Sequence, residues 1–365
     1  MKKILVISNG KGEDSIAVTI LQQLRSLLPA NDFRFMALPV VSDGSAYSKA
    51  GIEVLGPKTN LPSGGFGFQK FSSFIDDMRA GLVLDLYTRW RALKDSRADY
   101  ILAFGDIVTV LLALVTGQPV IHIGTAYSVH LRKIFWLERY FFLRCSLVLC
   151  RDEATAVHMR KQHIKAVCLG NAMMDDPLLQ VEPADFPPDK ILIALVPSSR
   201  LDAYTNLQRL LEVAVHIPEQ DKLAFIVSAA PNLDQERLKN IVEPFVGKLT
   251  ISLFNGKLGT VISRARIALG MTGTGNEQVA GLGKAMVLLN GGGPQSNSAR
   301  LIHYQKLLGE AVFVPQGSAQ EIGRQISALL IDESRLARIG QVGRERMGIA
   351  GAAEAMAKAI KEQLI

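Results

Sequence analysis

Ile267–Leu289 reads IALGMTGTGNEQVAGLGKAMVLL, and this stretch decides the fold expected for the chain. An apolar run, Ile267–Gly270, leads into a small-residue turn with the letters TGTG. A helix-compatible segment follows the turn, and a second apolar run, Ala285–Leu289, comes after it. The order predicts a strand, a tight loop, a helix and a parallel strand, which together make a right-handed βαβ unit.

The expected helix begins directly behind the glycine turn, where free backbone N–H groups and the positive end of the helix dipole favour an anion. The residues of this candidate phosphate site are Thr272, Gly273, Thr274 and Gly275. Glu277 falls in the first helical turn, where its carboxylate can accept hydrogen bonds from a ribose diol. An ordinary βα turn, with a threonine N-cap and a glutamate in the first turn, fits the same letters.

Length and composition point to a globular α/β chain of two ordinary domains. The 365 residues are 48% apolar and 21% charged, as in soluble globular proteins. The apolar run at the start of the chain ends at Asn9, before it reaches signal-peptide length, so it is interpreted as the first strand. Cys145, Cys150 and Cys168 form no metal-binding spacing, which predicts reduced thiols, a cytoplasmic protein and no zinc site.

The formal net charge is +7, which calls for an anionic partner. The basic residues are scattered and form no tract with interleaved aromatic residues, so nucleic acid is not expected as a partner. A phosphorylated substrate or an anionic membrane surface fits the charge better.

The loop after the first expected strand, Lys3–Ser8, carries candidate acceptor-side residues. They are Gly10, Gly12, Glu13 and Asp14, followed by a helix expected from about Ser15. A third glycine at dinucleotide-binding spacing is missing, and two carboxylates would repel a pyrophosphate. The loop is therefore predicted to face a hydroxyl-bearing acceptor, although a glycine turn with an acidic helix start is equally consistent.

Asp106 is the candidate catalytic base. It follows the expected strand Tyr100–Phe104, and the carboxyl ends of parallel strands border the ligand crevice of doubly wound sheets. The alternative is that Asp106 caps the helix expected over Ile107–Leu114. His122, in an apolar strand, is interpreted as a core histidine.

The segment Leu131–Arg144 reads LRKIFWLERYFFLR and is predicted to form a basic, aromatic helix. Such a helix can lie on an anionic bilayer, which would make the protein peripheral on the inner face of a membrane. A helix packed on the sheet, with its arginine side chains reaching to solvent, explains the same letters.

The best domain boundary is a proline-rich segment in the middle of the chain. We therefore expect an acceptor-side domain over residues 1–175 and a linker over 176–189. A donor-side domain is expected over 190–350, and a final helix over 351–365 that packs back on the first domain. The predicted architecture is two Rossmann-like, doubly wound α/β domains facing a cleft. A long helix is also expected over Phe68–Lys94.

Two further loops of the second half have side chains suited to a nucleotide sugar. Pro197–Arg200 follows an apolar strand, and Ser198 and Arg200 can bind a diphosphate, Arg200 as a bidentate clamp. A surface salt bridge is the alternative role for Arg200. After a triple glycine, the amides of Gln295 and Asn297 can bind sugar hydroxyls.

In this order, the motifs resemble the lipid-A-disaccharide synthase family of GT-B glycosyltransferases and its synthase-related members. LGNAMMDD is similar to the family's G-x-P-L-x-D segment, VPSSR to its L-P-G-S-R loop, and GMTGTGNEQVAGLGKAMVLL to its S-G-T-x-x-L-E donor helix. GGPQSNSARL resembles the Gln/Asn segment that contacts the donor sugar in related enzymes. The likeness extends over nearly the whole chain, although each motif is short.

The resemblance implies roles for individual residues. Glu277 would hold the uridine ribose, the 272–275 loop the diphosphate, and Arg200 would lie near the phosphates, while Asp106 would assist deprotonation of the acceptor. The first loop, SNGKGED, departs from the family's A-G-E-A-S-G-D, and Asp106 lacks the family's A-P-D-F-N context. Both departures fall on the acceptor side, so the acceptor stays open.

The sequence thus predicts an inverting glycosyltransferase that moves a sugar, of N-acetylglucosamine type, from a UDP-sugar to a lipid-linked or amphipathic acceptor. No DxD-type pair stands where a metal would be needed, so neither metal nor cofactor is expected, and the UDP-sugar is the substrate. Two alternatives remain, a UDP-sugar 2-epimerase and a non-catalytic protein that binds a nucleotide sugar.

Overall fold

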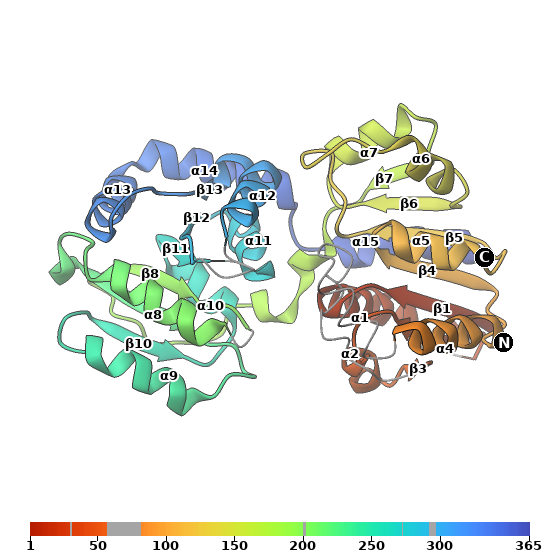
Figure 1. Cartoon of the computed structure of the whole chain (residues 1–365), viewed down its shortest axis with the longest axis horizontal. Coiled ribbons are helices and arrows are strands. Elements are labelled where there is room, and N and C mark those ends of the chain that lie inside the picture. The colour runs from red at the N-terminus through yellow and green to blue at the C-terminus, as the bar shows by residue number, and fades with distance from the viewer. Residues whose placement is uncertain (30, 57–81, 200–201, 272, 292–296) are drawn as a thin grey trace. The chain divides into compact units, whose positions relative to one another are not determined.

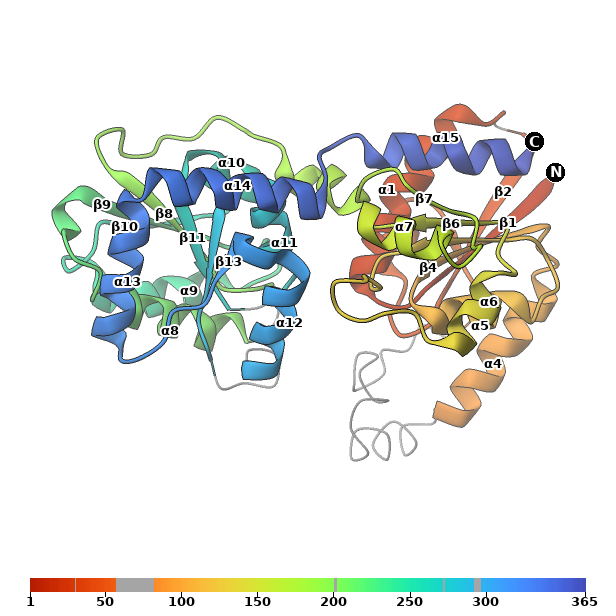
Figure 2. The same ribbon diagram turned by 90° about the horizontal axis from the view of Figure 1, so that it is seen from above.

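The computed structural model describes residues 1–29, 31–56, 82–199, 202–271, 273–291 and 297–365. They form two compact units, which are Met1–Asp175 with Ala350–Ile365 (unit 1) and Asp176–Ile349 (unit 2). In each unit, helices pack around a sheet of parallel strands (Figure 1, Figure 2). Both units are Rossmann-like, as the alternation of strands and helices in the sequence predicts.

The sheet of unit 1 has seven strands among the described residues, in the order β3-β2-β1-β4-β5-β6-β7. They are β1 (Lys2–Ser8), β2 (Phe33–Pro39), β3 (Glu53–Val54), β4 (Tyr100–Gly105), β5 (Val120–Gly124), β6 (Leu147–Cys150) and β7 (Ala166–Cys168). All pairs are parallel, and Ile7 of β1 lies between Leu38 and Ala103. The central residues of β1 are fully buried, because helices cover both faces of the sheet.

The helices of unit 1 differ from the sequence prediction at two places. They are α1 (Lys11–Leu27), α2 (Ser45–Lys49), α4 (Leu82–Asp95), α5 (Ile107–Leu114), α6 (Trp136–Phe142), α7 (Glu153–Arg160) and α15 (Ala352–Leu364). The start of α1 at Lys11, and not near Ser15, is the first difference. Gly10 is the N-cap, and the carboxylates of Glu13 and Asp14 in the first turn suit the positive end of the helix dipole.

The predicted helix over Leu131–Arg144 is the second difference, because only Trp136–Phe142 is helical. Glu138 sets the start of α6 by accepting a hydrogen bond from the Phe135 backbone N–H at 2.9 Å. Residues 68–81 of the long helix predicted over Phe68–Lys94 lie outside the described residues, and α4 covers its C-terminal part. None of the described helices is both long enough and apolar enough to span a bilayer.

The sheet of unit 2 has six strands among the described residues, in the order β10-β9-β8-β11-β12-β13. They are β8 (Ile191–Val196), β9 (Leu223–Ser228), β10 (Ile251–Phe254), β11 (Ile267–Gly270), β12 (Ala285–Leu288) and β13 (Val312–Phe313). The helices are α8 (Ala203–Ala214), α9 (Gln235–Val242), α10 (Leu258–Arg264), α11 (Thr274–Gly281), α12 (Ser298–Leu308), α13 (Ala319–Ile331) and α14 (Glu333–Met347). The strand, loop, helix and strand predicted from Ile267–Leu289 are thus β11, α11 and β12.

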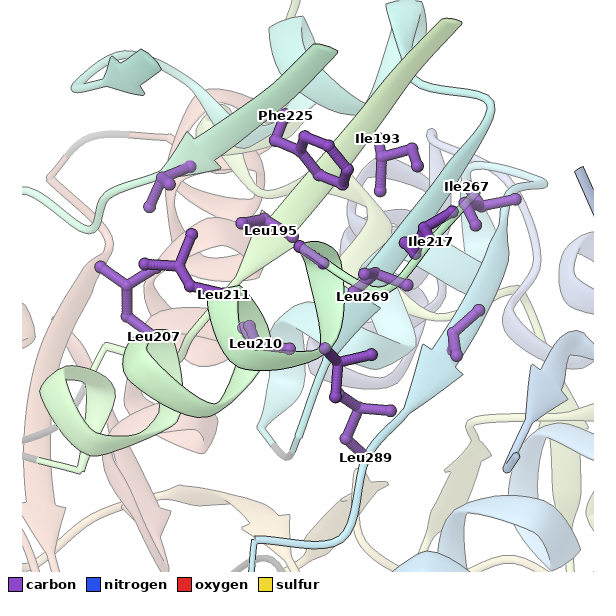
Figure 3. Packing of buried hydrophobic residues seen from close by; sticks show 14 of the residues in the cluster. Ile193, Leu195, Leu207, Leu210, Leu211, Ile217, Phe225, Ile267, Leu269 and Leu289 are labelled. Carbon is purple, nitrogen blue, oxygen red and sulfur yellow. The ribbon is translucent and has the colours of Figure 1, made fainter. Parts of the chain in front are cut away.

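The core of unit 2 forms between α8 and one face of this sheet. Leu207, Leu210 and Leu211 of α8 pack with side chains of β8, β9 and β11 (Figure 3). Because the apolar residues of α8 recur at helical spacing, one side of the helix is buried along its length. This packing fixes the position of α8 on the sheet.

α15 belongs to unit 1 although it follows unit 2 in the sequence. It packs against α1, and the Asp175 carboxylate caps its N-terminus, accepting hydrogen bonds from the Gly351 N–H and, at 2.7 Å, from the Ala353 N–H. The two places where the chain passes from one unit to the other are therefore joined at Asp175.

Buried His122 predicts a pH dependence of stability. Its Nδ1 lies 2.9 Å from the Ala103 carbonyl oxygen, and burial lowers the pKa of the ring from 6.5 to about 4. The neutral ring therefore contributes its full stabilisation above pH 6.5, and this contribution is lost as the pH falls toward 4. The contribution of His122 to the free energy of unfolding, measured with urea, should fall by about 2 kcal/mol between pH 7 and pH 5.

His122→Asn is the matched variant, because its amide can still donate to the Ala103 carbonyl. Burial raises the pKa of Glu13 and Asp14, and the effect of these shifts on stability cancels when the two proteins are compared. The variant should lose about 2 kcal/mol less than the wild type between pH 7 and 5. Equal losses in both proteins would show that His122 does not control acid stability.

Candidate functional site

In each sheet the order of strands reverses at one point, and the candidate site is expected next to that point. In unit 2 the reversal lies between β8 and β11, and in unit 1 between β1 and β4. Ligands of doubly wound folds bind beyond the carboxyl ends of the strands at such points. The residues that follow Val196, Gly270, Ser8 and Gly105 are therefore the first candidates.

The residues directly after β8 include a strained backbone conformation and hydrogen bonds to neighbouring side chains. Ser198 has φ 114°, a left-handed conformation that is costly for a residue with a side chain, and its hydroxyl donates to Asp202 at 3.1 Å. The amide of Asn206 donates to the Pro197 carbonyl at 2.9 Å, and that of Asn232 to the Ser199 carbonyl at 2.8 Å. A strained backbone that neighbouring side chains hold in place is typical of ligand-binding loops.

After β11, Gly273 forms two hydrogen bonds with the side chain of Tyr304 of α12. The Gly273 N–H donates to the Tyr304 hydroxyl at 3.1 Å, and the same hydroxyl donates to the Gly273 carbonyl at 3.2 Å. Gly273 has φ 124° and ψ 170°, a conformation open to glycine and strongly disfavoured for other residues. The hydroxyl thus holds both polar groups of the residue that caps α11.

The N-terminus of α11 lies against the end of β8. Gly270 pairs with Val196, and a Cβ on Gly275 would come within 3.4 Å of the Val196 side chain. Thr274 and Gly275 begin the helix, and Glu277 lies in its first turn, 8% exposed. The backbone N–H groups of this turn and the loop after β8 thus meet at one edge of the sheet, where an anion would be favoured.

Not every predicted donor residue can be placed at this edge. Ser198, Gly273, Thr274, Gly275 and Glu277 lie there, whereas Arg200, Thr272 and Gln295 are outside the described residues. Asn297, predicted to contact a sugar, is the N-cap of α12, where its side-chain oxygen accepts from the Arg300 N–H at 3.1 Å. The hydrogen bond leaves the Asn297 amide N–H groups to other partners.

In unit 1, Glu13 and Asp106 both lie at the corresponding edge, in the first turn of α1 and at the N-cap of α5. A Cβ on Gly105 would come within 3.7 Å of the Glu13 side chain, so the end of β4 lies against the first turn of α1. Thr125, after β5, donates to Glu13 Oε1 at 3.4 Å. Burial first, and then the charges of Asp14 and Asp106, raise the pKa of Glu13.

Asp106 and Asp14 both have structural partners. Asp106 Oδ1 accepts from the Val108 N–H at 2.9 Å and caps α5, the alternative role considered for it. Asp14 is buried, and it accepts hydrogen bonds from the hydroxyls of Ser8, at 2.6 Å, and Ser42. Tyr47 donates to Ser8 at 2.8 Å. Asp14 therefore lies in a buried network, whereas Glu13, the other carboxylate of the predicted acceptor-side loop, is partly buried.

The sequence analysis missed three residues of these edges. Tyr304 and Thr125 reach their partners from other elements, so no local pattern could have assigned them. Asn276 lies within the quoted central stretch, is 1% exposed, and its amide forms no hydrogen bond with any described residue. A buried amide of this kind is costly, and a polar ligand at this edge would supply a partner for it. In the described parts of the chain, no three His, Cys, Asp or Glu side chains are grouped as metal ligands.

The two hydrogen bonds to Gly273 predict that the Tyr304 hydroxyl contributes measurably to the stability of the fold. Tyr304→Phe keeps the ring but leaves the Gly273 N–H and C=O without this partner, so the free energy of unfolding should fall by about 1–3 kcal/mol. Urea denaturation measures the loss. Tyr140→Phe removes an exposed hydroxyl and should change stability by less than about 0.5 kcal/mol. Equal stability of the two variants would show that the hydrogen bonds between Tyr304 and Gly273 do not stabilise the fold.

Solved structures with this fold include enzymes of two kinds. CalG4, the calicheamicin glycosyltransferase, has a TM-score of 0.66 and 15% identity over 100% of this chain and 98% of its own. MurG of Acinetobacter baumannii has a TM-score of 0.63 and 15% identity, over 99% and 100%. The UDP-GlcNAc 2-epimerase of Neisseria meningitidis, solved with UDP-GlcNAc, has a TM-score of 0.57 and 14% identity, over 99% and 100%.

The sequence itself matches no protein-family model and no curated protein. At these identities the structural likeness shows the fold alone, and it does not reach the narrower lipid-A-disaccharide synthase family. The chain therefore has the GT-B fold, two Rossmann-like domains, which glycosyltransferases share with UDP-GlcNAc 2-epimerases.

Proposed function

We propose that this protein is a UDP-sugar-dependent glycosyltransferase. In this proposal it moves a sugar of N-acetylglucosamine type to a hydroxyl of an amphipathic, lipid-linked acceptor at the inner face of a membrane, with inversion and without a metal. The observation that carries the proposal is the edge of unit 2, where the N-terminus of α11, the strained loop after β8 and Glu277 come together.

The donor would bind at this edge. Diphosphate oxygens would accept hydrogen bonds from backbone N–H groups in the first turn of α11, and the helix dipole would favour their charge. Ser198 would add a hydroxyl, and the Glu277 carboxylate would accept from the ribose diol. The charge that develops on the departing diphosphate would then be stabilised by a fixed dipole and, through Arg200, by a cation.

The acceptor hydroxyl would be activated in unit 1. Both Glu13 and Asp106 are candidates, and their positions favour Glu13 as the base. One oxygen of Asp106 is engaged as the cap of α5, whereas burial raises the pKa of Glu13 toward the range in which a carboxylate is an effective base. The negative charge of Asp106 contributes to that raised pKa.

A UDP-sugar 2-epimerase is the second candidate, because solved epimerases have the same fold with comparable TM-scores. Such an enzyme needs no acceptor. The motif resemblance to the lipid-A-disaccharide synthase family favours the transferase, as does the exposed aromatic surface on unit 1.

UDP binding tests the donor site. The wild-type protein should bind UDP in calorimetry and melt at a higher temperature in its presence. Glu277→Ala should weaken the affinity by at least about 1 kcal/mol, roughly fivefold, because a charge-assisted contact is lost. Glu236→Ala, in the first turn of α9, removes a comparable carboxylate and should leave UDP affinity unchanged. Absence of UDP binding in the wild type would overturn the donor site.

Release of UDP from UDP-N-acetylglucosamine, with water as acceptor, tests the base. Glu13→Gln still accepts from Thr125, and Asp106→Asn still caps α5, so both variants should fold. Glu13→Gln should lower kcat by about 10²–10⁴ and leave UDP affinity unchanged. A loss confined to Asp106→Asn would assign the base to Asp106 instead.

Incubation with UDP-N-acetylglucosamine alone separates the two candidate enzymes. A transferase should yield only UDP and free sugar, whereas an epimerase would yield the manno isomer, and proton NMR distinguishes these products. Formation of UDP-N-acetylmannosamine would replace the transferase with the epimerase.

A further inference from the structure

Unit 2 has a basic pocket at the amino ends of its strands. The pocket has a volume of about 300 Å³ and is lined by Arg266, residues 282–285, Leu336 and Arg344. Arg266 directly precedes β11 and Lys284 directly precedes β12, so the four residues of β11 separate the pocket from the donor edge by about 13 Å. We call it the α14 pocket, and it is distinct from the candidate site described above.

Glycines bring α14 onto the end of α11 and fix the position of Arg344. A Cβ on Gly343 would clash with the Ala280 carbonyl oxygen, and a Cβ on Gly340 would come within 2.6 Å of the Gly283 carbonyl oxygen. Gly283 has φ 76°, in the left-handed region that favours glycine, and a Cβ there would clash with Arg344 Nη1. The guanidinium thus occupies the space that a side chain at position 283 would need.

Backbone carbonyls hold the other two cations in place. Lys284 Nζ donates to two of them, the nearer being that of Ala265 at 2.7 Å. Arg266 Nε donates to the Leu330 carbonyl at 3.1 Å, and its Nη2 pairs with Glu333. An ammonium has three N–H groups and a guanidinium has five, so each cation keeps N–H groups for a further partner.

Positive charge exceeds negative charge in the α14 pocket. Among the described residues, no Asp or Glu side chain lines it. Glu333 pairs with Arg266, whereas neither Lys284 nor Arg344 forms an ion pair with a described residue, so the three cations and Glu333 leave a net charge of +2. Burial first, and then the charge of Arg266, lowers the pKa of Lys284. An anion among the three cations would relieve their repulsion.

We propose that the α14 pocket binds a small organic phosphate monoester. Such a group carries a charge of about −1.5 to −2 at pH 7 and has three strong acceptor oxygens, which match the charge and the number of the cations. The pocket has the volume of about ten water molecules, which is more than a phosphate group alone fills. Because Leu282 and Leu336 also line it, an apolar organic group fits beside the phosphate.

A purely structural role for the cations is the alternative. Lys284 and Arg266 bond to carbonyls at the C-terminal ends of α10 and α13, where positive charge is favoured. Arg344 lies in the last turn of α14, but its guanidinium is held over Gly283 and bonds to no described carbonyl or carboxylate. A structural role therefore leaves Arg344 unexplained, and ligand binding separates the two alternatives.

Calorimetric titration of the full chain with phenyl phosphate tests the proposal. Saturating UDP is present, so that the donor edge is occupied. The wild type should bind one phenyl phosphate with a Kd below about 1 mM, and added salt should weaken the binding. Inorganic phosphate should bind more weakly, because it lacks the group that contacts Leu282 and Leu336. The proposal does not rest on the proposed function, and failure of UDP to bind would count against the donor site alone.

Matched variants locate the site. Arg344→Gln should lower the affinity for phenyl phosphate at least about fivefold, and Lys284→Gln by a similar factor, because each removes a charge-assisted contact. Arg344→Lys keeps the charge and should retain more affinity than Arg344→Gln. Arg338→Gln removes a cation of the same helix that pairs with Glu310, and it should leave the affinity unchanged. Circular dichroism and melting temperature establish that each variant is folded.

Four outcomes would overturn the proposal. Absence of binding up to about 10 mM phenyl phosphate would exclude a ligand of this class. Unchanged affinity in Arg344→Gln and Lys284→Gln would place the bound ester elsewhere. An equal loss in Arg338→Gln would show that net charge, and not the α14 pocket, attracts the ester. Inorganic phosphate that binds as tightly as phenyl phosphate would show that the pocket does not recognise an organic group.

Discussion

Burial of parallel strands on both faces is the constraint from which the rest of this structure follows. Helices cover the two faces of each sheet, so side chains in the strand interiors serve packing alone. Ligands can therefore reach only the loops at the strand ends. Where the strand order reverses, two neighbouring loops run to opposite faces of the sheet and leave a crevice between them. The residues after β8 and β11 in unit 2, and after β1 and β4 in unit 1, are therefore the places where such a fold can bind a ligand.

Both edges depend on hydrogen bonds from outside the loops that they shape. Tyr304 of α12 bonds to Gly273, Asn206 and Asn232 donate to the carbonyls of Pro197 and Ser199, and Thr125, which follows β5, donates to Glu13. Hydrogen bonds of this kind restrain the residues that they hold, and a restrained backbone loses less entropy when a ligand binds.

Much of the fold was predictable from the sequence, because buried parallel strands appear as continuous apolar runs such as Ile191–Val196. The start of α1 and the extent of α6 were not predictable, since capping by Gly10 and by Glu138 sets these boundaries. Local motifs predicted that the loop after β11 and Glu277 would lie at the start of a helix, as they do, whereas Tyr304 comes from a distant element. The competition between capping and catalysis at Asp106 could be stated from the sequence, but only its bond to Val108 shows one role in place.

The return of α15 to unit 1 has a consequence for biosynthesis. Unit 2 is one continuous segment, whereas unit 1 is interrupted by it and includes Ala350–Ile365, which is synthesised after unit 2. The buried face of α15 covers α1, so α1 keeps apolar surface exposed while unit 2 is being made. On the ribosome, the inserted unit can thus fold before the unit that surrounds it in sequence is complete, and the nascent chain carries an open apolar face throughout that interval.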